Sequence, residues 1–211
     1  MSATLATDTL KRTQAERTAE SDMRMLAAAI SLLVEKGTER TTLKEVGERA
    51  GYSRGLASYR FGSKAGLFSF IIRAVGEDWL DELQRAVKSK VGVEAIHAAT
   101  DAHYHFVSES ADSIRAFYLL WFDSIGPDPD LRDVITKVHE RRSTDVANWI
   151  RAGIQAGTIK SDVPVEVVAE QFCTSIIGIV YQWLATPEEI KKIHKLHEGL
   201  KTQMLMALPA N

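Results

Sequence analysis

The chain has 211 residues, of which 45% are hydrophobic and 26% are charged, and its formal net charge is −2. This balance is ordinary for a soluble protein of one or two small domains and is too apolar for a disordered chain. A single cysteine, Cys173, excludes an internal disulfide framework and a zinc site built from several cysteines, and it fits a reducing cytoplasm.

No segment reads as a membrane span or a secretory signal. The longest nearly uncharged stretch, 167–185, is interrupted by Glu170 and contains several other polar residues. The first 13 residues contain no apolar core and no small-residue cleavage site. We therefore expect a cytoplasmic protein with no membrane partner.

Charge is unevenly distributed along the chain. Residues 1–64 contain 11 Lys and Arg against 8 Asp and Glu, whereas the remaining residues contain 15 against 20. A basic module joined to an acidic body suits a DNA-binding protein with a separate regulatory domain, because phosphate neutralisation is a local requirement. The alternative, chance clustering of charge on a solvated face, is not separated from this interpretation by charge alone.

Helix start and stop signals predict nine helices and an all-α fold. A capping box at Thr13–Glu16 opens the first helix, and Gly37 ends its apolar repeat. The later helices are expected to begin near a second capping box at Thr42–Glu45, Ser53, Ser63, Val91, Ser113, Asp128-Pro129, Asp162–Pro164 and a third capping box at Thr186–Glu189. The last helix is expected to end near Leu208, and residues 1–12 are expected to be a disordered tail.

The stretch 41–67, TTLKEVGERAGYSRGLASYRFGSKAGL, carries the most information. Its two short helices form a helix-turn-helix, since Gly51 can adopt the positive φ that redirects the chain. The second helix is the candidate reader of the DNA major groove, where Arg54 can donate two hydrogen bonds to a guanine edge and Gly55 permits close backbone approach. The candidate DNA-binding residues are Thr41, Thr42, Tyr52, Ser53, Arg54, Gly55, Leu56, Ser58, Tyr59, Arg60 and Lys64.

This stretch resembles the tetracycline-repressor (TetR) family of transcriptional regulators. The shared pattern is Thr41-Thr42, then Ala-Gly-x-Ser-x-Gly at 50–55, then aromatic-x-Phe-x-Ser-Lys-x-x-Leu at 59–67. Ser58 stands where the family typically has tyrosine, and Tyr59 follows one position later. The resemblance implies a helix-turn-helix DNA-binding domain of three helices over 13–62, followed by a helical effector-binding and dimerisation domain over 63–211.

Aromatic side chains recur at helical spacing after residue 63, and most of them can be explained as core packing. The resemblance implies an effector cavity among the fourth to eighth helices, which suits a largely apolar small molecule. His103 points to the same helix face as Ile96 and Val107, either as a ligand contact or as a core histidine satisfied by a neighbour. The candidate ligand-binding residues are Trp79, His103, Tyr104, Phe117, Tyr118, Trp121, Phe122, Trp149 and Phe172.

The last two helices read as an association surface. The eighth is apolar nearly all round and must be covered on both sides, and Ser175 and Gly178 would permit close helix approach. The resemblance implies a four-helix bundle with a second copy, which places two reading helices on one pseudo-palindromic operator; burial within one chain is the alternative. The candidate interface residues are Val168, Phe172, Ser175, Ile176, Ile179, Trp183, Ile193, His197, Leu200 and Met204.

Nothing in the sequence favours an enzyme, a cofactor or a metal centre. Glu94–His97 matches one Glu-x-x-His element of a di-iron site, but the required second copy is absent. There is no glycine-rich phosphate loop, nucleophile elbow or His-Glu-x-x-His motif. Three further groups are interpreted as structural or solvated: the pair His194 and His197, the stripe His97, Asp101 and His105, and Cys173.

The sequence therefore predicts a homodimeric, sequence-specific DNA-binding regulator, most simply a repressor that a small-molecule effector releases from a palindromic operator. The alternatives are an activator, and a helix-turn-helix regulator or assembly factor that binds no small molecule. The effector and the operator sequence are not specified by these patterns.

Overall fold

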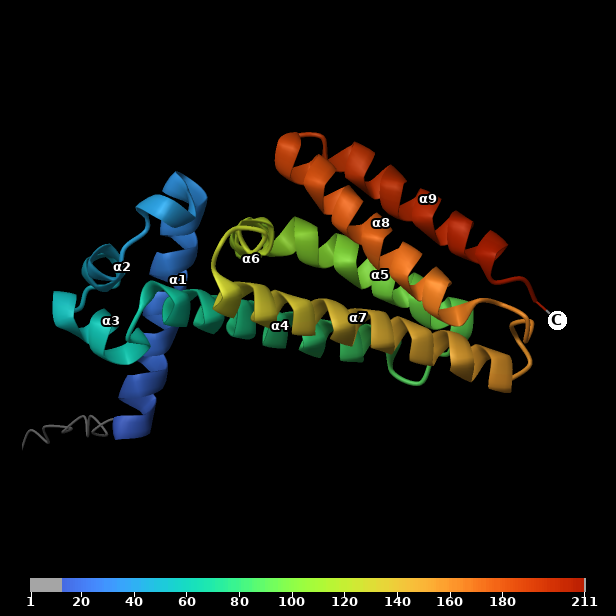
Figure 1. Ribbon diagram of the computed structural model, residues 1–211, viewed down its shortest axis with the longest axis horizontal. Helices are drawn as coiled ribbons and strands as arrows, with labels where there is room; N and C mark the ends of the chain where they lie inside the picture. Colours follow the sequence, from blue (N-terminus) through green and yellow to red (C-terminus); the bar gives the residue numbers. More distant parts are fainter. Residues whose placement is uncertain (1–12, 211) are drawn as a thin grey trace, which may run out of the picture.

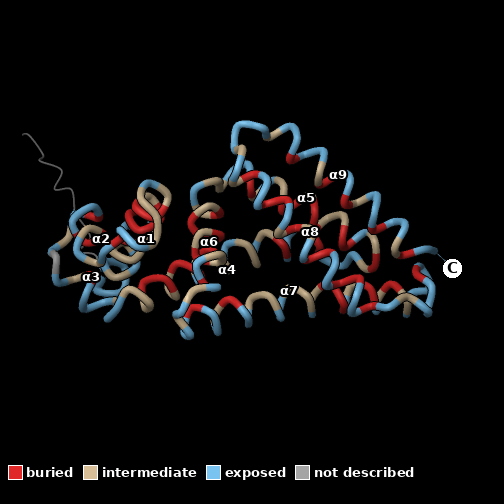
Figure 2. The backbone as a smooth tube through the Cα atoms, turned by 45° about the horizontal axis from the view of Figure 1, so that its top comes forward, coloured by how far each residue is buried: buried red, intermediate tan, exposed pale blue. Residues whose placement is uncertain are grey.

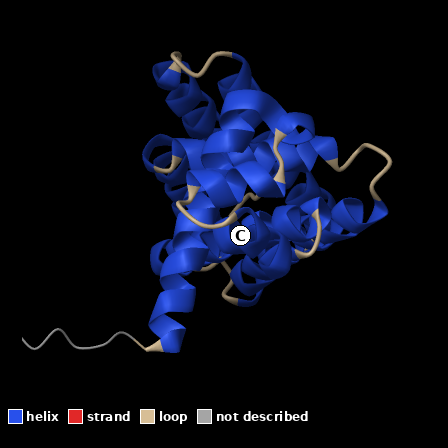
Figure 3. Cartoon of the chain, turned by 90° about the vertical axis from the view of Figure 1, so that its left-hand side faces the viewer, coloured by secondary structure: helices blue, strands red, loops and turns tan. Residues whose placement is uncertain are grey.

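The computed structural model describes residues 13–210, apart from the side chain of Arg54. These residues form nine helices and no strand, which confirms the predicted all-α fold (Figures 1 and 3). The helices are α1 (Gln14–Arg40), α2 (Leu43–Arg49), α3 (Arg54–Phe61), α4 (Lys64–Val87), α5 (Gly92–Glu109), α6 (Ala111–Asp123), α7 (Pro129–Gln155), α8 (Val165–Ala185) and α9 (Ile190–Ala207). The predicted disordered tail, 1–12, lies outside the described residues.

Most helices begin at the residues whose side chains can cap them. Thr13 forms a complete capping box with Glu16, and Asp128 caps α7 ahead of Pro129. At α2 only half of the predicted box forms, because the Glu45 carboxylate accepts hydrogen bonds from the Thr42 hydroxyl (2.7 Å) and from Lys36 Nζ (2.5 Å). The Thr42 hydroxyl still accepts a hydrogen bond from the backbone N–H of Glu45, which satisfies one orphan amide.

Three predicted boundaries differ from the structure. Gly37 interrupts α1 with φ +78°, but one more turn follows it to Arg40. The helix α6 begins at Ala111, ahead of Ser113. The predicted capping box at Thr186 closes α8 instead of opening α9, because the Thr186 hydroxyl donates back to the Gln182 carbonyl (3.1 Å) and residues 186–189 form a turn.

The chain folds into a small N-terminal module, α1 to α3, and an elongated body, α4 to α9, with α4 running from one into the other (Figure 1). In the body α7 packs against α5 and α8, and α8 packs against α9; α1 of the module packs against α6. Buried positions face the spaces between helices and exposed positions face outward (Figure 2). One continuous hydrophobic core extends from Met25 on α1 to Leu208. Module and body are therefore packed together and not merely tethered.

Among the described residues, α8 is the one helix long and apolar enough to cross a membrane by length and composition. It packs against α7 and α9, and Phe172, Ile176 and Trp183 are among the residues it buries. The apolar composition of α8 is explained by its place in the core.

Two glycines permit backbone approaches that a side chain would block. A Cβ on Gly66 of α4 would lie 2.1 Å from the carbonyl oxygen of Phe61, the last residue of α3. A Cβ on Gly153 of α7 would lie 2.7 Å from the Cα of Gly92 on α5. The α3–α4 junction and the α5–α7 crossing both depend on the missing side chain.

Candidate DNA-binding and ligand sites

The helix-turn-helix is held by a small buried interface and a glycine turn. Val46 of α2 and Ala57 of α3 are completely buried against each other's helices. Gly51 adopts φ +79°, and the Tyr52 N–H donates to the Gly47 carbonyl (2.9 Å). These contacts fix the direction of α3 and leave one of its faces uncovered.

The uncovered face of α3 carries Gly55, Ser58, Tyr59 and Arg60, all exposed. Tyr59 is 88% exposed, which makes it the most exposed large hydrophobic side chain of the described residues. Ser53 caps α3 by position and makes no side-chain cap hydrogen bond. A hydroxyl, a helix N-terminus and an aromatic ring thus face outward together, a combination suited to phosphates and base edges.

Several predicted DNA-binding residues, including the exposed Arg60, make contacts within the chain. Thr41 is completely buried and its hydroxyl donates to the Gly37 carbonyl (2.8 Å), so we leave it out of the candidate surface. Arg60 pairs with Asp22 of α1, and Lys64 Nζ donates to the Glu39 carbonyl (2.8 Å). Tyr52 and Leu56 pack against the core, and Thr42 caps α2. Arg54 begins α3, but its side chain lies outside the described part of the structure.

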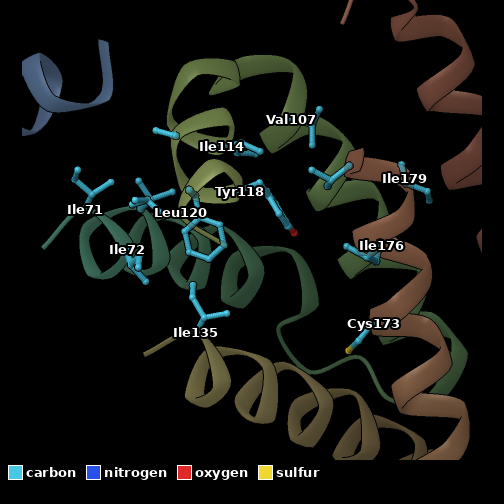
Figure 4. Packing of buried hydrophobic residues seen from close by; sticks show 14 of the residues in the cluster. Ile71, Ile72, Val107, Ile114, Tyr118, Leu120, Ile135, Cys173, Ile176 and Ile179 are labelled. Atoms are coloured by element: carbon cyan, nitrogen blue, oxygen red, sulfur yellow. The ribbon is translucent and has the colours of Figure 1, made fainter. Parts of the chain in front are cut away.

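A cavity of about 520 Å³ opens in the body between α4, α5, α6, α7 and α8. Figure 4 shows the Tyr118 side chain pointing from α6 toward Ile176 of α8. Six of the nine predicted ligand-binding residues line this cavity: Trp79, His103, Phe117, Tyr118, Trp149 and Phe172. The size and the mostly apolar lining suit a small organic molecule.

Three predicted residues do not line the cavity. The Tyr104 ring packs edge-on against His194 of α9 (4.7 Å between centroids). The Phe122 ring faces Tyr181 of α8 (6.2 Å). The Trp121 ring packs against the guanidinium of Arg142 on α7 (5.1 Å from the ring centroid) and does not itself line the cavity. Helical spacing places all three on α5 or α6 but does not tell which neighbouring helix each one meets.

His103 lies on the buried face of α5, as its spacing from Ile96 and Val107 predicts, and is 4% exposed. Its Nδ1 lies 2.9 Å from Nε2 of His197 on α9, and the His197 Nδ1 lies 2.9 Å from the Ile193 carbonyl. Burial lowers the pKa of His103 well below its usual value, and the neighbouring His197 and Arg142 charges act in the same direction. Burial also lowers the pKa of His197. Both rings are therefore neutral at pH 7.

Arg142 of α7 is a cavity residue that sequence reasoning missed. Its guanidinium carbon lies 5.1–5.8 Å from the ring centroids of Trp121, Phe117 and Tyr118, and Nη1 donates to the Tyr118 hydroxyl (3.1 Å). The available signal was its spacing, since Val138, Arg142 and Val146 recur every four residues. A cation on an otherwise apolar helix face is the pattern that would have identified it.

The lone cysteine lines the same cavity and is buried. Burial raises the pKa of Cys173 to about 11, which keeps the thiol protonated and weakly nucleophilic at neutral pH. This setting agrees with the structural role expected for it.

The histidine stripe of α5 is less solvated than expected. His97 Nε2 lies 3.1 Å from the Lys201 carbonyl of α9, and Asp101 accepts a hydrogen bond from Lys201 Nζ (2.7 Å). His105 alone of the three is exposed. The reason is that α9 packs along α5 and covers the stripe.

The structure places the predicted dimer residues inside the protomer. Nine of the ten are buried within the protomer and Ser175 is half-buried; the buried ones are Val168, Phe172, Ile176, Ile179, Trp183, Ile193, His197, Leu200 and Met204. The apolar stripe of α8 that looked available to a partner packs inward on the chain's own helices.

A different face of α8 is left open. Six exposed residues on it recur at alternating spacings of four and three and form an uncharged stripe: Val167, Gln171, Thr174, Gly178, Tyr181 and Ala185. Beside this stripe, the exposed Glu166 pairs with Arg151 of α7, and the exposed Glu170 accepts a hydrogen bond from Ser143 of α7. Val167 is 54% exposed and Tyr181 59%. An uncharged exposed stripe at this spacing is typical of helices that pack against another helix.

These features define an all-helical helix-turn-helix regulator with a separate cavity. Residues 25–70 match the family model described as bacterial regulatory proteins, tetR family. Residues 25–70 therefore carry the N-terminal helix-turn-helix module of the TetR family of transcriptional regulators.

Curated relatives extend over most of the chain. It is 29% identical over 187 residues to the transcriptional regulator CymR of Pseudomonas putida, covering 87% of this chain and 90% of CymR. It is 24% identical to YfiR of Bacillus subtilis (strain 168), an uncharacterized helix-turn-helix-type regulator, covering 89% and 91%.

Solved structures share the fold. A TetR-family regulator from Rhodococcus sp. superimposes with a TM-score of 0.77 at 16% identity, covering 90% of this chain and 100% of the other. SmeT of Stenotrophomonas maltophilia in its triclosan complex gives a TM-score of 0.74 at 19% identity, covering 89% and 90%. At these identities the structures establish the architecture.

Proposed function

We propose that this regulator is a homodimeric repressor that a small-molecule effector releases from a palindromic operator. The observation that carries the proposal is the position of α4. This helix leaves the helix-turn-helix at Ser63 and then lines the cavity with Ile72, Val75 and Trp79. A ligand in the cavity thus touches the helix that continues directly from the helix-turn-helix.

The coupling follows from rigid geometry. Two half-sites lie a fixed helical repeat apart, so a small tilt of α4 in each protomer changes the separation of the two α3 helices and breaks contacts on one side. Effector and DNA would then weaken each other's binding reciprocally, typically by about 1–3 kcal/mol. Two structural neighbours support a ligand-binding role: SmeT was solved with triclosan, and a regulator from Saccharomonospora viridis with choline.

The test of DNA reading is selection of bound fragments from a random duplex library at fixed, moderate salt. We expect one enriched palindromic site. Replacing Tyr59 with alanine should weaken binding to that site about tenfold or more, the usual cost of losing a direct contact. Ile125→Ala, at a turn residue that is 78% exposed, is the control and should bind as the wild type does. Binding that is salt-sensitive but yields no enriched site would overturn the proposal.

The dimer is proposed to form through the uncharged stripe of α8. Replacing Thr174 with arginine places a charge in the middle of that stripe and should convert a dimer into a monomer in light scattering after size exclusion. Thr136→Arg, at an exposed position of α7, is the matched control and should remain dimeric. A Thr174→Arg protein that is still dimeric would show that another surface holds the two copies.

A further inference from the structure

The cavity contains a cation with no anionic partner. Within the described residues, no carboxylate forms an ion pair with Arg142, whereas its neighbour Arg141 pairs with Asp145 (3.3 Å). The three aromatic rings around the guanidinium stabilise it through their faces but do not neutralise it. Only one of its five N–H groups has a described hydrogen-bond acceptor, the Tyr118 hydroxyl. The remaining N–H groups of this half-buried cation are therefore available to a ligand that enters the cavity.

The other charges of the cavity wall also favour an anionic ligand. Its lining includes four basic residues, Arg73, Lys137, Arg141 and Arg142, against two acidic residues, Glu77 and Asp145. The ion pair between Arg141 and Asp145 cancels one charge of each sign and leaves three basic residues against one acidic residue, so the field at the cavity is positive. An anion is attracted into this space and a cation is repelled.

The buried pair of His103 and His197 provides a hydrogen-bond acceptor. The Ile193 carbonyl can only accept, so His197 Nδ1 carries its proton and Nε2 accepts. His103 Nδ1 must therefore donate to His197, which leaves His103 Nε2 without a proton. No described residue donates to that nitrogen, and His103 lines the cavity. The cavity wall thus includes, besides its unpaired cation, the acceptor nitrogen of a neutral histidine.

We propose that the effector is an aromatic carboxylic acid whose carboxylate pairs with Arg142 and whose hydrogen-bond donor is accepted by His103 Nε2. This inference rests on the proposed function of the cavity and adds the chemical class of its ligand. The guanidinium fork matches a carboxylate with two parallel N–H···O hydrogen bonds. The surrounding rings of Trp79, Phe117 and Trp149 cover the aromatic frame.

The test uses matched pairs of compounds. Naphthalene-, biphenyl- and indole-based carboxylic acids, each with and without a ring hydroxyl, are compared with their primary carboxamides by titration calorimetry on the full chain. We expect at least one acid to bind at least tenfold more tightly than its amide, and its hydroxylated form to bind more tightly again. Equal or tighter binding of the amides, or binding of neither series, would overturn the proposal.

Variants assign the effect to the two side chains. Arg142→Met keeps the length of the side chain and should abolish the preference for acids, whereas Arg142→Lys keeps the charge and should retain part of it. Lys160→Met, at an exposed position outside the cavity lining, is the control and should keep the full preference. His103→Phe should remove only the gain from the ring hydroxyl. An acid preference that survives in Arg142→Met would overturn the assignment to this residue.

Operator release is measured separately. If an acid binds through Arg142 and also lowers operator affinity, the ligand class and the proposed function both hold. If it binds through Arg142 and leaves operator affinity unchanged, the ligand class holds and the proposed function fails. If amides or cations bind instead and release the operator, the proposed function holds and the ligand class fails.

Discussion

Replacing Gly66 with alanine is expected to lower the free energy of unfolding by about 2–3 kcal/mol, the usual range for forcing atoms into a filled space. The new Cβ would lie 2.1 Å from the Phe61 carbonyl oxygen, a backbone atom that cannot rotate away. Relief requires the first turn of α4 to move from the end of α3. Urea unfolding measures the loss in the free energy of unfolding. Operator binding, at a temperature where the variant is folded, reports whether the helix-turn-helix has changed its angle to α4.

Gly76→Ala is the matched control because it lies in the same helix and its Cβ would meet nothing within 4 Å. Here alanine should stabilise the helix by up to about 1 kcal/mol, as it does at open helical positions. If the two variants unfold at the same denaturant concentration, the close α3–α4 junction is not a source of stability.

Acidification from pH 6.5 to pH 5 is expected to destabilise the protein through the buried histidine pair. Each ring has a lowered pKa in the folded chain, so the unfolded chain binds protons first as the pH falls below about 6.5. Each histidine that stays neutral in the folded chain then lowers the free energy of unfolding by up to about 1.4 kcal/mol per pH unit. Above pH 6.5 neither histidine makes the free energy of unfolding depend on pH. Urea unfolding at several pH values gives the slope.

The control for this prediction is His103→Gln, which keeps a neutral hydrogen-bonding side chain and removes one titrating group. Its stability should fall about half as steeply over the same range. Carboxyl groups with a lowered pKa, such as Glu45 and Glu170, reduce stability only as the pH falls below the ordinary glutamate pKa of 4.5, so they do not affect the range from pH 6.5 to pH 5. An unchanged slope in the variant would assign the acid sensitivity to other groups.

The helices could be predicted from the sequence because their ends are set by hydrogen bonds between residues close together in the sequence. Thr13, Thr42, Ser63 and Asp128 each satisfy backbone N–H groups two or three residues away, and those contacts need no tertiary partner. The error at Thr186 has the same origin. Its hydroxyl had two backbone partners within four residues, and the choice between them depended on how α8 ends.

The faces of the helices were harder to predict than their bounds. A helical wheel shows that α8 is apolar on two sides, but not which side the chain's own α7 and α9 cover. The predicted dimer residues therefore fell on the inner face. The ligand site was partly predicted for a related reason. Aromatic spacing identifies cavity walls, whereas the sequence does not show that three rings of α6 surround Arg142 of α7.

The helix α6 belongs to both functional parts of the chain. It lines the cavity with Ile114, Phe117 and Tyr118, and it also packs against α1 of the N-terminal module. Because α6 contributes to both the cavity and the packing of α1, its sequence is more constrained in evolution than that of a helix with one role. A substitution on α6 that adapts the cavity to a new compound also changes the packing of α6 on α1 of the N-terminal module. In the described part of the chain, α5, α7 and α8 do not pack against that module to a comparable extent. New ligand preferences should therefore accumulate first on those three helices, with α6 changing last.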